Sequence, residues 1–258
     1  MWEKELDIAK EAAVKAGEAI MDIYQNAKDM QIEYKDGDMP LTAADKAANQ
    51  IIVQMLTAAF PKYAVLSEEE KDDRARLKND YCFVVDPLDG TKEFIKRNGQ
   101  FTVNIALAYQ GKSVMGVIYV PVTGALYWAS EGSGAYLTAD GRTEKLHVSD
   151  RKEDIRAVMS SSHGCAEMDN LIQVNHLSNY VRMGSSLKGC VIAKGDAEIY
   201  YRFNPTMEWD TAAMQCIVEE AGATFRQMDD TLMRYNRENC RNEKGFYIIN
   251  CAENKMKL

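Results

Sequence analysis

The stretch Cys82–Asn104, CFVVDPLDGTKEFIKRNGQFTVN, decides how this chain folds. Its aromatic and β-branched residues at positions 83–85 predict the end of a buried strand, because the apolar run stops at Asp86-Pro87. Pro87 has no N–H to donate to a neighbouring strand, and Gly90 permits backbone angles that other residues avoid. We therefore expect the strand to stop and the chain to turn directly after Val85.

The predicted bend gathers oxygen atoms. It carries Asp86 and Asp89, with the Leu88 carbonyl between them and the Thr91 hydroxyl just beyond. One interpretation is an ordinary Asp-Pro turn with local side-chain hydrogen bonds. The other is a site for a hard cation, since two carboxylates held this close repel each other unless a cation compensates them. Acidic residues elsewhere in the chain favour the cation site: Glu68, Glu69 and Asp210.

Length and composition narrow the function classes. The 258 residues, 46% of them hydrophobic and 27% charged, fit one large or two modest domains of ordinary soluble composition. A net charge of −8 argues against binding nucleic acid or anionic membranes through bulk charge. The six cysteines form no C-x-x-C pair and only three histidines occur, so a zinc site is not expected and a reduced compartment is.

The N-terminal residues argue against a signal peptide. MWEKELDIAKEAAVKAG carries charge through the part that would be the apolar core of such a peptide, and no later run reaches membrane-spanning length. We therefore expect a cytoplasmic protein with no integral membrane segment. Peripheral contact with the inner membrane stays open, as does the choice between monomer and homodimer.

Two helices are expected before the central stretch. Helical spacing of apolar residues runs from Glu3 to about Ala27, and a second helix is predicted from an N-cap at Thr42 to the residue before Pro61. Asp45 suits the acidic position of a capping box, and a carboxylate there can also orient a nearby hydroxyl. A short strand at 64–66 then leads straight into Glu68 and Glu69, where a carboxylate is costly without a cation partner.

An antiparallel sheet is expected from the central stretch onward, with strands at 101–107, 114–120 and 124–129. A charged segment at 150–154 predicts a boundary between an N-terminal α+β domain, residues 1–150, and a C-terminal α/β domain, residues 151–258. The second domain is expected to begin with the strand AVMSSS at 157–162 and a helix at 166–179, and to close with strands at 223–225 and 245–250.

Two further segments in the second half suggest a site. Gly184-Ser185-Ser186 precedes helical spacing, so this turn caps a helix or cradles an anion, and Lys188 would serve the anion. Asp210 begins a helix that ends at Gly222, where an N-cap is the simplest role for the aspartate.

Three motifs in order resemble the metal-binding signatures of the inositol monophosphatase family: LSEE (66–69), DPLDGTKEF (86–94) and WDTAA (209–213). Together with GSSLK (184–188) and YYRFNPT (200–206), they are more similar to its 3'(2'),5'-bisphosphate nucleotidase branch. The resemblance implies a layered αβαβα sandwich, of the inositol monophosphatase and fructose-bisphosphatase type. It also implies a lithium-sensitive, Mg²⁺-dependent phosphatase that converts 3'-phosphoadenosine 5'-phosphate to AMP and phosphate, an activity of sulfur metabolism.

The resemblance also implies roles for individual residues. It makes Glu68, Asp86 and the Leu88 carbonyl ligands of a first Mg²⁺, and Asp86, Asp89 and Asp210 ligands of another, with two or three ions in all. Glu68 and Thr91 would position the attacking water, and Asp45 would accept a hydrogen bond from Thr91. The implied substrate contacts are Gly90, Thr91, Gly184, Ser185, Ser186, Lys188, Arg202 and Asp210.

Two other functions are compatible with the acidic residues. An inositol-1-phosphate phosphatase would share them, although the basic GSSLK to Arg202 region suits a second phosphate better. A non-catalytic cation-binding protein would be expected to have lost an acid or Thr91, and this chain keeps them all. One departure from the family pattern is Met214, where a glycine usually follows WDxAA.

Overall fold

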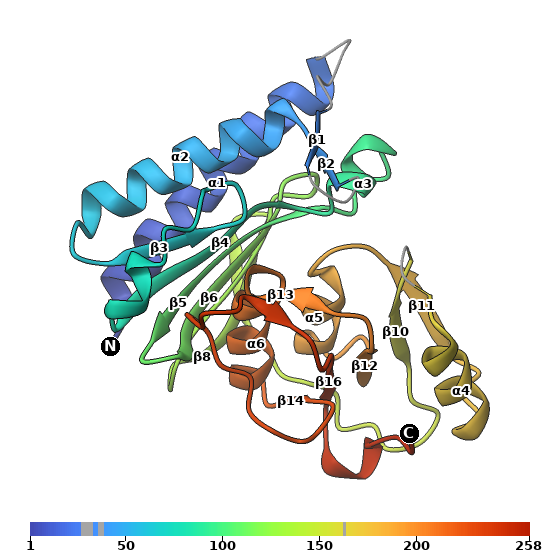
Figure 1. Ribbon diagram of the computed structural model, residues 1–258. Helices are drawn as coiled ribbons and strands as arrows, with labels where there is room; N and C mark the ends of the chain where they lie inside the picture. The colour runs from blue at the N-terminus through green and yellow to red at the C-terminus, as the bar shows by residue number, and fades with distance from the viewer. Residues whose placement is uncertain (27–32, 36–38, 162–163) are drawn as a thin grey trace.

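Two β-sheets alternate with three layers of helices in the computed structural model, which describes residues 1–26, 33–35, 39–161 and 164–258 (Figure 1). The first outer layer holds α1 (Glu3–Asn26) and α2 (Ala43–Ala59), and the central layer holds α5 (Leu187–Ala193) and α6 (Glu208–Glu220). Helix α4 (Ala166–Val174) covers the far side of the second sheet. This order confirms the expected αβαβα sandwich.

The larger sheet has seven strands in the order β3-β4-β5-β6-β7-β8-β9. Strand β3 pairs with β4 in parallel, and every later neighbour is antiparallel. The strands are β3 (Ala64–Ser67), β4 (Tyr81–Asp89), β5 (Thr102–Tyr109), β6 (Lys112–Val120), β7 (Ala125–Ser130), β8 (Gly134–Ala139) and β9 (Arg142–Lys145). Both faces of β4 are buried, because Phe83 and Val85 pack toward the outer helices while Cys82 and Val84 pack toward the central layer.

The smaller sheet has five strands in the order β11-β10-β12-β16-β14. Strand β10 is parallel to both neighbours, whereas β16 is antiparallel to both of its own. Its strands are β10 (Ala157–Ser160), β11 (Tyr180–Met183), β12 (Ile199–Arg202), β14 (Thr224–Gln227) and β16 (Phe246–Ile249). The remaining short elements are α3 (Thr91–Ile95), β1 (Glu33–Lys35), β2 (Met39–Leu41), β13 (Thr206–Met207), β15 (Arg241–Asn242), η1 (Ala75–Lys78) and η2 (Ala252–Asn254).

The largest hydrophobic core lies between the sheets. It combines residues from both halves of the sequence, among them Val84, Ile118, Ala212 and Phe246. Gly116 on β6 permits this packing, since a Cβ there would lie 2.4 Å from the Ala213 carbonyl oxygen of α6. The division into domains at residue 150 therefore stays a prediction, with one shared core across it.

Strand β4 corrects the prediction that the chain turns after Val85. The strand continues through Pro87 to Asp89, and the turn comes at Gly90, whose φ is +98°. Between Asp86, opposite Asn104, and Asp89, opposite Thr102, the ladder shifts register, so β4 has one residue more than β5. This is a β-bulge, which accommodates a proline without ending the strand.

Smaller differences concern element ends. Helix α4 stops at Val174, before the expected 179, and β11 was not expected at all. Helix α1 is described to Asn26, and the expected end at Ala27 lies outside the described residues, as does Ser162 at the end of the expected strand. The capping box of α2 is confirmed: Ala44 N–H donates to Thr42 Oγ1 at 3.2 Å, and Thr42 N–H donates to Asp45 Oδ2 at 2.8 Å.

Candidate metal centre

Three carboxylates meet where the two sheets face each other. Asp86 and Asp89 come from the end of β4 and Asp210 from the first turn of α6, and one oxygen from each lies within 4.8 Å of the other two. Residues three apart on a regular strand point to opposite faces, but the extra residue of the bulge brings Asp86 and Asp89 to the same side. The bulge therefore builds the cluster.

The pKa values in this cluster favour a cation. Burial, and then the charges of Glu68, Asp89 and Asp210, raise the pKa of Asp86 well above its usual value. Burial and then Asp89 raise the pKa of Asp210 to about 7. A divalent cation would remove this repulsion, and hard oxygen donors at this spacing suit such an ion. The donor set therefore fits a metal.

Asp89 is tied to the second half of the chain. Its Oδ2 accepts from the Ser186 N–H at 2.6 Å, from the Ser186 hydroxyl at 2.7 Å and from Asn104 Nδ2 at 3.2 Å. Because one oxygen takes these bonds, the carboxylate is held in a single orientation. Asn104 was not among the site residues predicted from the sequence, although a lone amide in the apolar run FTVNIAL indicated it.

Thr91 and Asp45 meet as the resemblance implied. The Thr91 hydroxyl lies 3.1 Å from Asp45 Oδ1 and 3.3 Å from the Leu88 carbonyl oxygen, while Asp45 Oδ2 completes the helix cap. Burial raises the pKa of Asp45, although its hydrogen bonds from Thr42 and Thr91 oppose that rise. Asp45 therefore both caps α2 and holds a hydroxyl at the site.

Two other expected ligands lie beside the cluster. Glu68 follows β3, where its N–H donates to the Val85 carbonyl at 3.1 Å, and its charge raises the pKa of both Asp86 and Asp210. The Leu88 N–H donates to Asp86 Oδ1 at 3.1 Å, which fixes the bulge that presents the Leu88 carbonyl. The structure thus brings Glu68 near the three aspartates.

Asp210 is not an N-cap. Helix α6 begins at Glu208, so Asp210 is its third residue, and Asp210 Oδ2 accepts from the Met207 N–H at 2.7 Å. The expected N-cap role is wrong because the helix begins two residues earlier than the sequence indicated. Like Asp45, this acid fixes a helix start with one oxygen.

The turn at 184–186 offers fewer free backbone N–H groups to an anion than we expected. The Gly184 N–H donates to Gln100 Oε1 at 2.8 Å and the Ser186 N–H donates to Asp89, so both amides have protein acceptors. Ser186 makes no side-chain cap to α5, since its hydroxyl also goes to Asp89. Ser185 adopts a left-handed conformation, with φ of +46°. Of the three residues, Ser185 is the one left for an anion in this geometry.

A cationic pair lies next to the acids. Lys188 is only 6% exposed, its ammonium lies 5.5 Å from the centre of the Tyr200 ring, and it donates to the Ser185 carbonyl. Burial lowers the pKa of Lys188 to about 8, and the charge of Arg202 contributes to this fall. Arg202 also opposes the rise in the pKa of Asp210, which places it near both groups. Lys188 is thus a buried cation and not a solvated surface lysine.

Among the described residues, no helix combines the length and apolar character needed to cross a bilayer. All six cysteines are free.

Comparisons with known proteins identify relatives along nearly the whole chain. The model of the inositol monophosphatase family matches residues 1–253. The 3'(2'),5'-bisphosphate nucleotidase CysQ of Salmonella typhimurium is 42% identical over 234 residues, covering 90% of this chain and 94% of that protein. CysQ of Escherichia coli strain K12 is 40% identical over 244 residues, covering 94% and 98%.

Solved structures agree with these relatives. A crystal structure of CysQ from Bacteroides thetaiotaomicron, described as a bacterial member of the inositol monophosphatase family, superimposes with a TM-score of 0.85 at 41% identity, covering 96% of this chain and 97% of that chain. The extragenic suppressor protein suhB from Bartonella henselae gives a TM-score of 0.80 at 30% identity, covering 95% and 93%. This chain belongs to the inositol monophosphatase family.

Proposed function

We propose that this protein is a divalent-metal-dependent phosphatase that removes the 3'-phosphate of 3'-phosphoadenosine 5'-phosphate, giving AMP and phosphate. The observation that carries the proposal is the acid cluster of Asp86, Asp89 and Asp210 beside two cations, the buried Lys188 and the partly buried Arg202. A substrate with two phosphates can place one at the metal centre and the other at the cations. The naming of its relatives as 3'(2'),5'-bisphosphate nucleotidases supports the same substrate.

Carboxylate and carbonyl oxygens would hold the metal, which we propose to be Mg²⁺ in two or three ions. The ligands are assigned as Glu68, Asp86, the Leu88 carbonyl, Asp89 and Asp210. When bound, such ions neutralise the acids, activate water and stabilise charge on a transferring phosphoryl group. These residues contribute only oxygen ligands, which favours a hard ion over zinc.

Thr91 is assigned to the attacking water, together with Glu68. Asp45 accepts a hydrogen bond from the Thr91 hydroxyl at 3.1 Å, so the lone pairs of the hydroxyl oxygen can accept a hydrogen bond from the attacking water and orient it. Gly90 and Thr91 are assigned to the scissile phosphate through their backbone N–H groups. A water molecule and a phosphate oxygen held in this way are oriented before the reaction. This orientation raises the rate, because the reacting groups no longer have to find each other.

Lys188, Arg202 and Ser185 are assigned to the second phosphate and the nucleoside side, with Gly184 and Ser186 supporting them through the bonds described above. Asp89 and Ser186 join the metal centre to this side, since they share two short hydrogen bonds. These bonds support a fixed spacing between the two proposed phosphate sites. An inositol monophosphate has no second phosphate to meet the cations, so the geometry does not favour that substrate.

The first test compares phosphate release from 3'-phosphoadenosine 5'-phosphate, inositol 1-phosphate and fructose 1,6-bisphosphate at equal low concentration with Mg²⁺. We expect strong preference for the nucleotide, and equal or better turnover of a sugar phosphate would overturn the substrate assignment. Asp86→Asn, Asp89→Asn and Asp210→Asn should each abolish turnover. Asp229→Asn, at an exposed aspartate paired with Lys244, is the matched control and should keep full activity.

We also infer a cytoplasmic setting, supported by six free cysteines that form no disulfide. Inhibition by Li⁺ is part of the proposal and is measured in the same assay. Peripheral attachment at an inner membrane gains no support from the described residues. Light scattering on the purified protein would decide between monomer and homodimer.

A further inference from the structure

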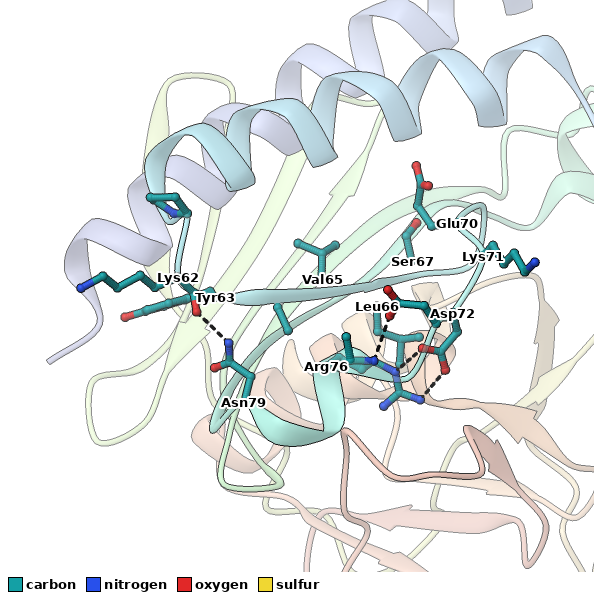
Figure 2. A pocket seen from close by; sticks show the side chains of 14 residues that line it. Lys62, Tyr63, Val65, Leu66, Ser67, Glu70, Lys71, Asp72, Arg76 and Asn79 are labelled. Atoms are coloured by element: carbon teal, nitrogen blue, oxygen red, sulfur yellow. Dashed lines mark hydrogen bonds and ion pairs between the residues drawn. The ribbon is translucent and has the colours of Figure 1, made fainter.

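A buried arginine ties the segment before β4 to the C-terminal part of the chain. Arg76, on η1, is 4% exposed, and its Nε and Nη2 donate to the two carboxylate oxygens of Asp72 at 3.0 and 2.8 Å (Figure 2). Its Nη1 donates to Asn236 Oδ1 at 2.8 Å, and Nη2 also donates to the Arg237 carbonyl at 2.9 Å. The guanidinium thus bridges segments 160 residues apart in sequence.

The connection runs in both directions. Asn236 Nδ2 lies 3.1 Å from the carbonyl oxygens of both Arg76 and Asn79, so the amide donates back to the η1 segment. We call Arg76, Asp72 and Asn236 the clasp. Its bonds fix the backbone of 76–79 against the backbone of 236–237.

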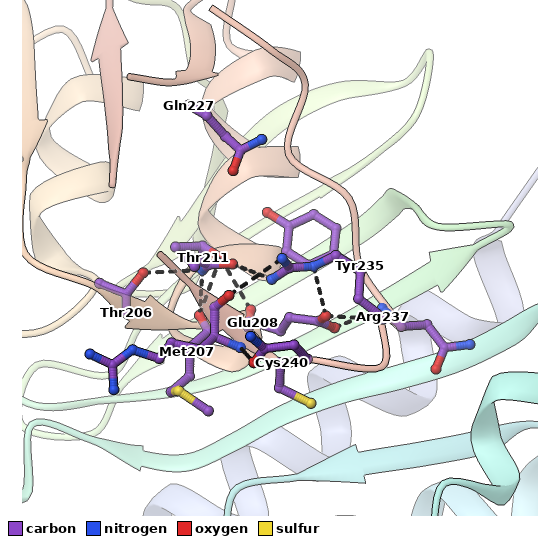
Figure 3. A network of polar contacts seen from close by, with 12 residues as sticks. Thr206, Met207, Glu208, Thr211, Gln227, Tyr235, Arg237 and Cys240 are labelled. Atoms are coloured by element: carbon purple, nitrogen blue, oxygen red, sulfur yellow. Dashed lines mark hydrogen bonds and ion pairs between the residues drawn. The ribbon is translucent and has the colours of Figure 1, made fainter. Parts of the chain in front are cut away.

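Glu208 extends the clasp to the metal centre. This fully buried glutamate, the first residue of α6, accepts from the N–H groups of Asn236 at 2.6 Å and Arg237 at 3.0 Å, and from Arg237 Nε at 3.0 Å (Figure 3). Its own N–H donates to the Cys240 carbonyl at 2.9 Å. Asp210 lies in the same helical turn, so the position of residues 236–237 is linked to that of this carboxylate through Glu208.

The η1 segment lies beside a pocket. This pocket, of about 320 Å³, lies between β3 and residues 70–79, and Leu66, Ser67, Glu70 and Arg76 are among the residues that line it (Figure 2). Among the lining residues, Asn79 Nδ2 donates to the Lys62 carbonyl at 2.7 Å, which ties the end of η1 to the segment before β3 (Figure 2). The clasp ties the same η1 segment to residues 236–237, and so connects it to the start of α6.

We propose that Arg76 is a positioning residue, which sets the separation between the acids of the large sheet and Asp210 of α6 and so sets metal affinity. The inference rests on the proposed metal centre but not on the identity of the substrate. Hydrogen-bond partners that orient metal ligands typically change metal affinity about 10- to 100-fold when removed. Arg76 acts on Asp210 through residues 236–237 and Glu208, so loss of the clasp should weaken metal binding at the lower end of that range, by about tenfold.

The test measures metal binding without turnover. Mn²⁺ is titrated into the full-length protein and free Mn²⁺ is read by electron paramagnetic resonance, for wild type, Arg76→Met and Asn236→Gly. Glycine is chosen at 236 because Asn236 has a φ of +56°, which glycine adopts without strain. Asn236→Gly keeps the Arg76–Asp72 pair, so it gives an answer if Arg76→Met does not fold.

Arg156→Met is the matched control. Arg156, directly before β10, likewise donates through Nε and Nη2 to one carboxylate, that of the fully buried Glu198 directly before β12, at 3.2 and 2.5 Å. We expect all three variants to lower the melting temperature, and only the clasp variants to weaken Mn²⁺ binding. Wild-type Mn²⁺ affinity in folded Asn236→Gly, or equal weakening in Arg156→Met, would overturn the inference.

The outcomes separate this inference from the proposed function. Weakened Mn²⁺ binding in a protein that releases no phosphate from the nucleotide supports the clasp and refutes the activity. Nucleotide hydrolysis with Mn²⁺ affinity unaffected by the clasp variants supports the activity and refutes the clasp. A wild-type protein that binds no Mn²⁺ would overturn both.

Discussion

Gly189→Ala is predicted to destabilise the protein, because Met214 fills the space that the missing side chain leaves. A Cβ at position 189 would lie 2.2 Å from Met214 Cγ and 2.6 Å from Met214 Sδ. Met214 is 3% exposed, so its side chain has no solvent to move into. The methionine that departs from the family pattern on α6 is thus accommodated by a glycine on α5.

The expected cost follows from two opposing effects. Forcing an extra methyl group into a packed core costs about 1–3 kcal/mol. Alanine favours a helix over glycine by up to about 1 kcal/mol, which offsets part of this. The net loss of about 1–2 kcal/mol in the free energy of unfolding corresponds to a fall of about 2–8 °C in melting temperature for a chain of this size.

Differential scanning calorimetry of four proteins would test the reasoning: wild type, Gly189→Ala, Met214→Ala and the double variant. In the double variant the alanine at 189 occupies vacated space, so the two effects should be non-additive by about 1 kcal/mol or more. Gly164→Ala is the control, since nothing lies within 4 Å of a Cβ there. An unchanged or raised melting temperature for Gly189→Ala, or strict additivity, would refute the packing argument.

Three further predictions concern the site. Thr91→Ala should lower kcat about 100-fold or more with KM little changed, because the hydroxyl acts on the attacking water, whereas Thr91→Ser should keep most activity; a change in KM alone would contradict this role. The charge of Lys188 is lost as pH rises through about 8, so kcat/KM for the bisphosphate should fall above pH 8, by at most about tenfold per pH unit, and a pH profile identical in Lys188→Gln would count against the contact. Without metal, the pKa of Asp210 is about 7 in the folded state, against an ordinary value of 3.8. The folded state therefore binds more protons than the unfolded state between about pH 4 and 7. Stability in EDTA should therefore fall as pH rises through that window, by up to about 4 kcal/mol, and Mg²⁺ should raise the melting temperature more at pH 8 than at pH 5; equal shifts at both pH values would contradict the buried-acid cluster.

The chemistry of the site could be predicted from the sequence because its residue types are specific. DPLDG, LSEE and WDTAA place hard oxygen donors at recognisable intervals, and the capping box at Thr42 and Asp45 follows from local preferences. The fold class followed from the same motifs. These signals depend on residue identity and neighbours in sequence, which a sequence displays directly.

What could not be predicted depends on partners distant in sequence. The strand prediction stopped at Val85 because the bulge exists only through pairing with β5. The turn at 184–186 was expected to cap a helix or to cradle an anion, and the Ser186 hydroxyl instead donates to Asp89, 97 residues away. Lys188 and Arg76 are likewise buried by residues that come later in the chain, such as Tyr200 and Asn236. Propensity rules describe the conformational preferences of neighbouring residues, and they do not include contacts between residues that are distant in sequence.

The bulge in β4 makes the geometry of the site depend on the number of residues between Asp86 and Asp89. With one extra residue opposite β5, Asp86 and Asp89 face the central helices together; with none, one of them would face α1 and α2. Inserting a single residue between them would turn one carboxylate toward the apolar residues that face α1 and α2, while the overall topology stayed the same. Insertions at this position are therefore far less tolerable than substitutions, even though the segment contains a proline and lies next to a turn.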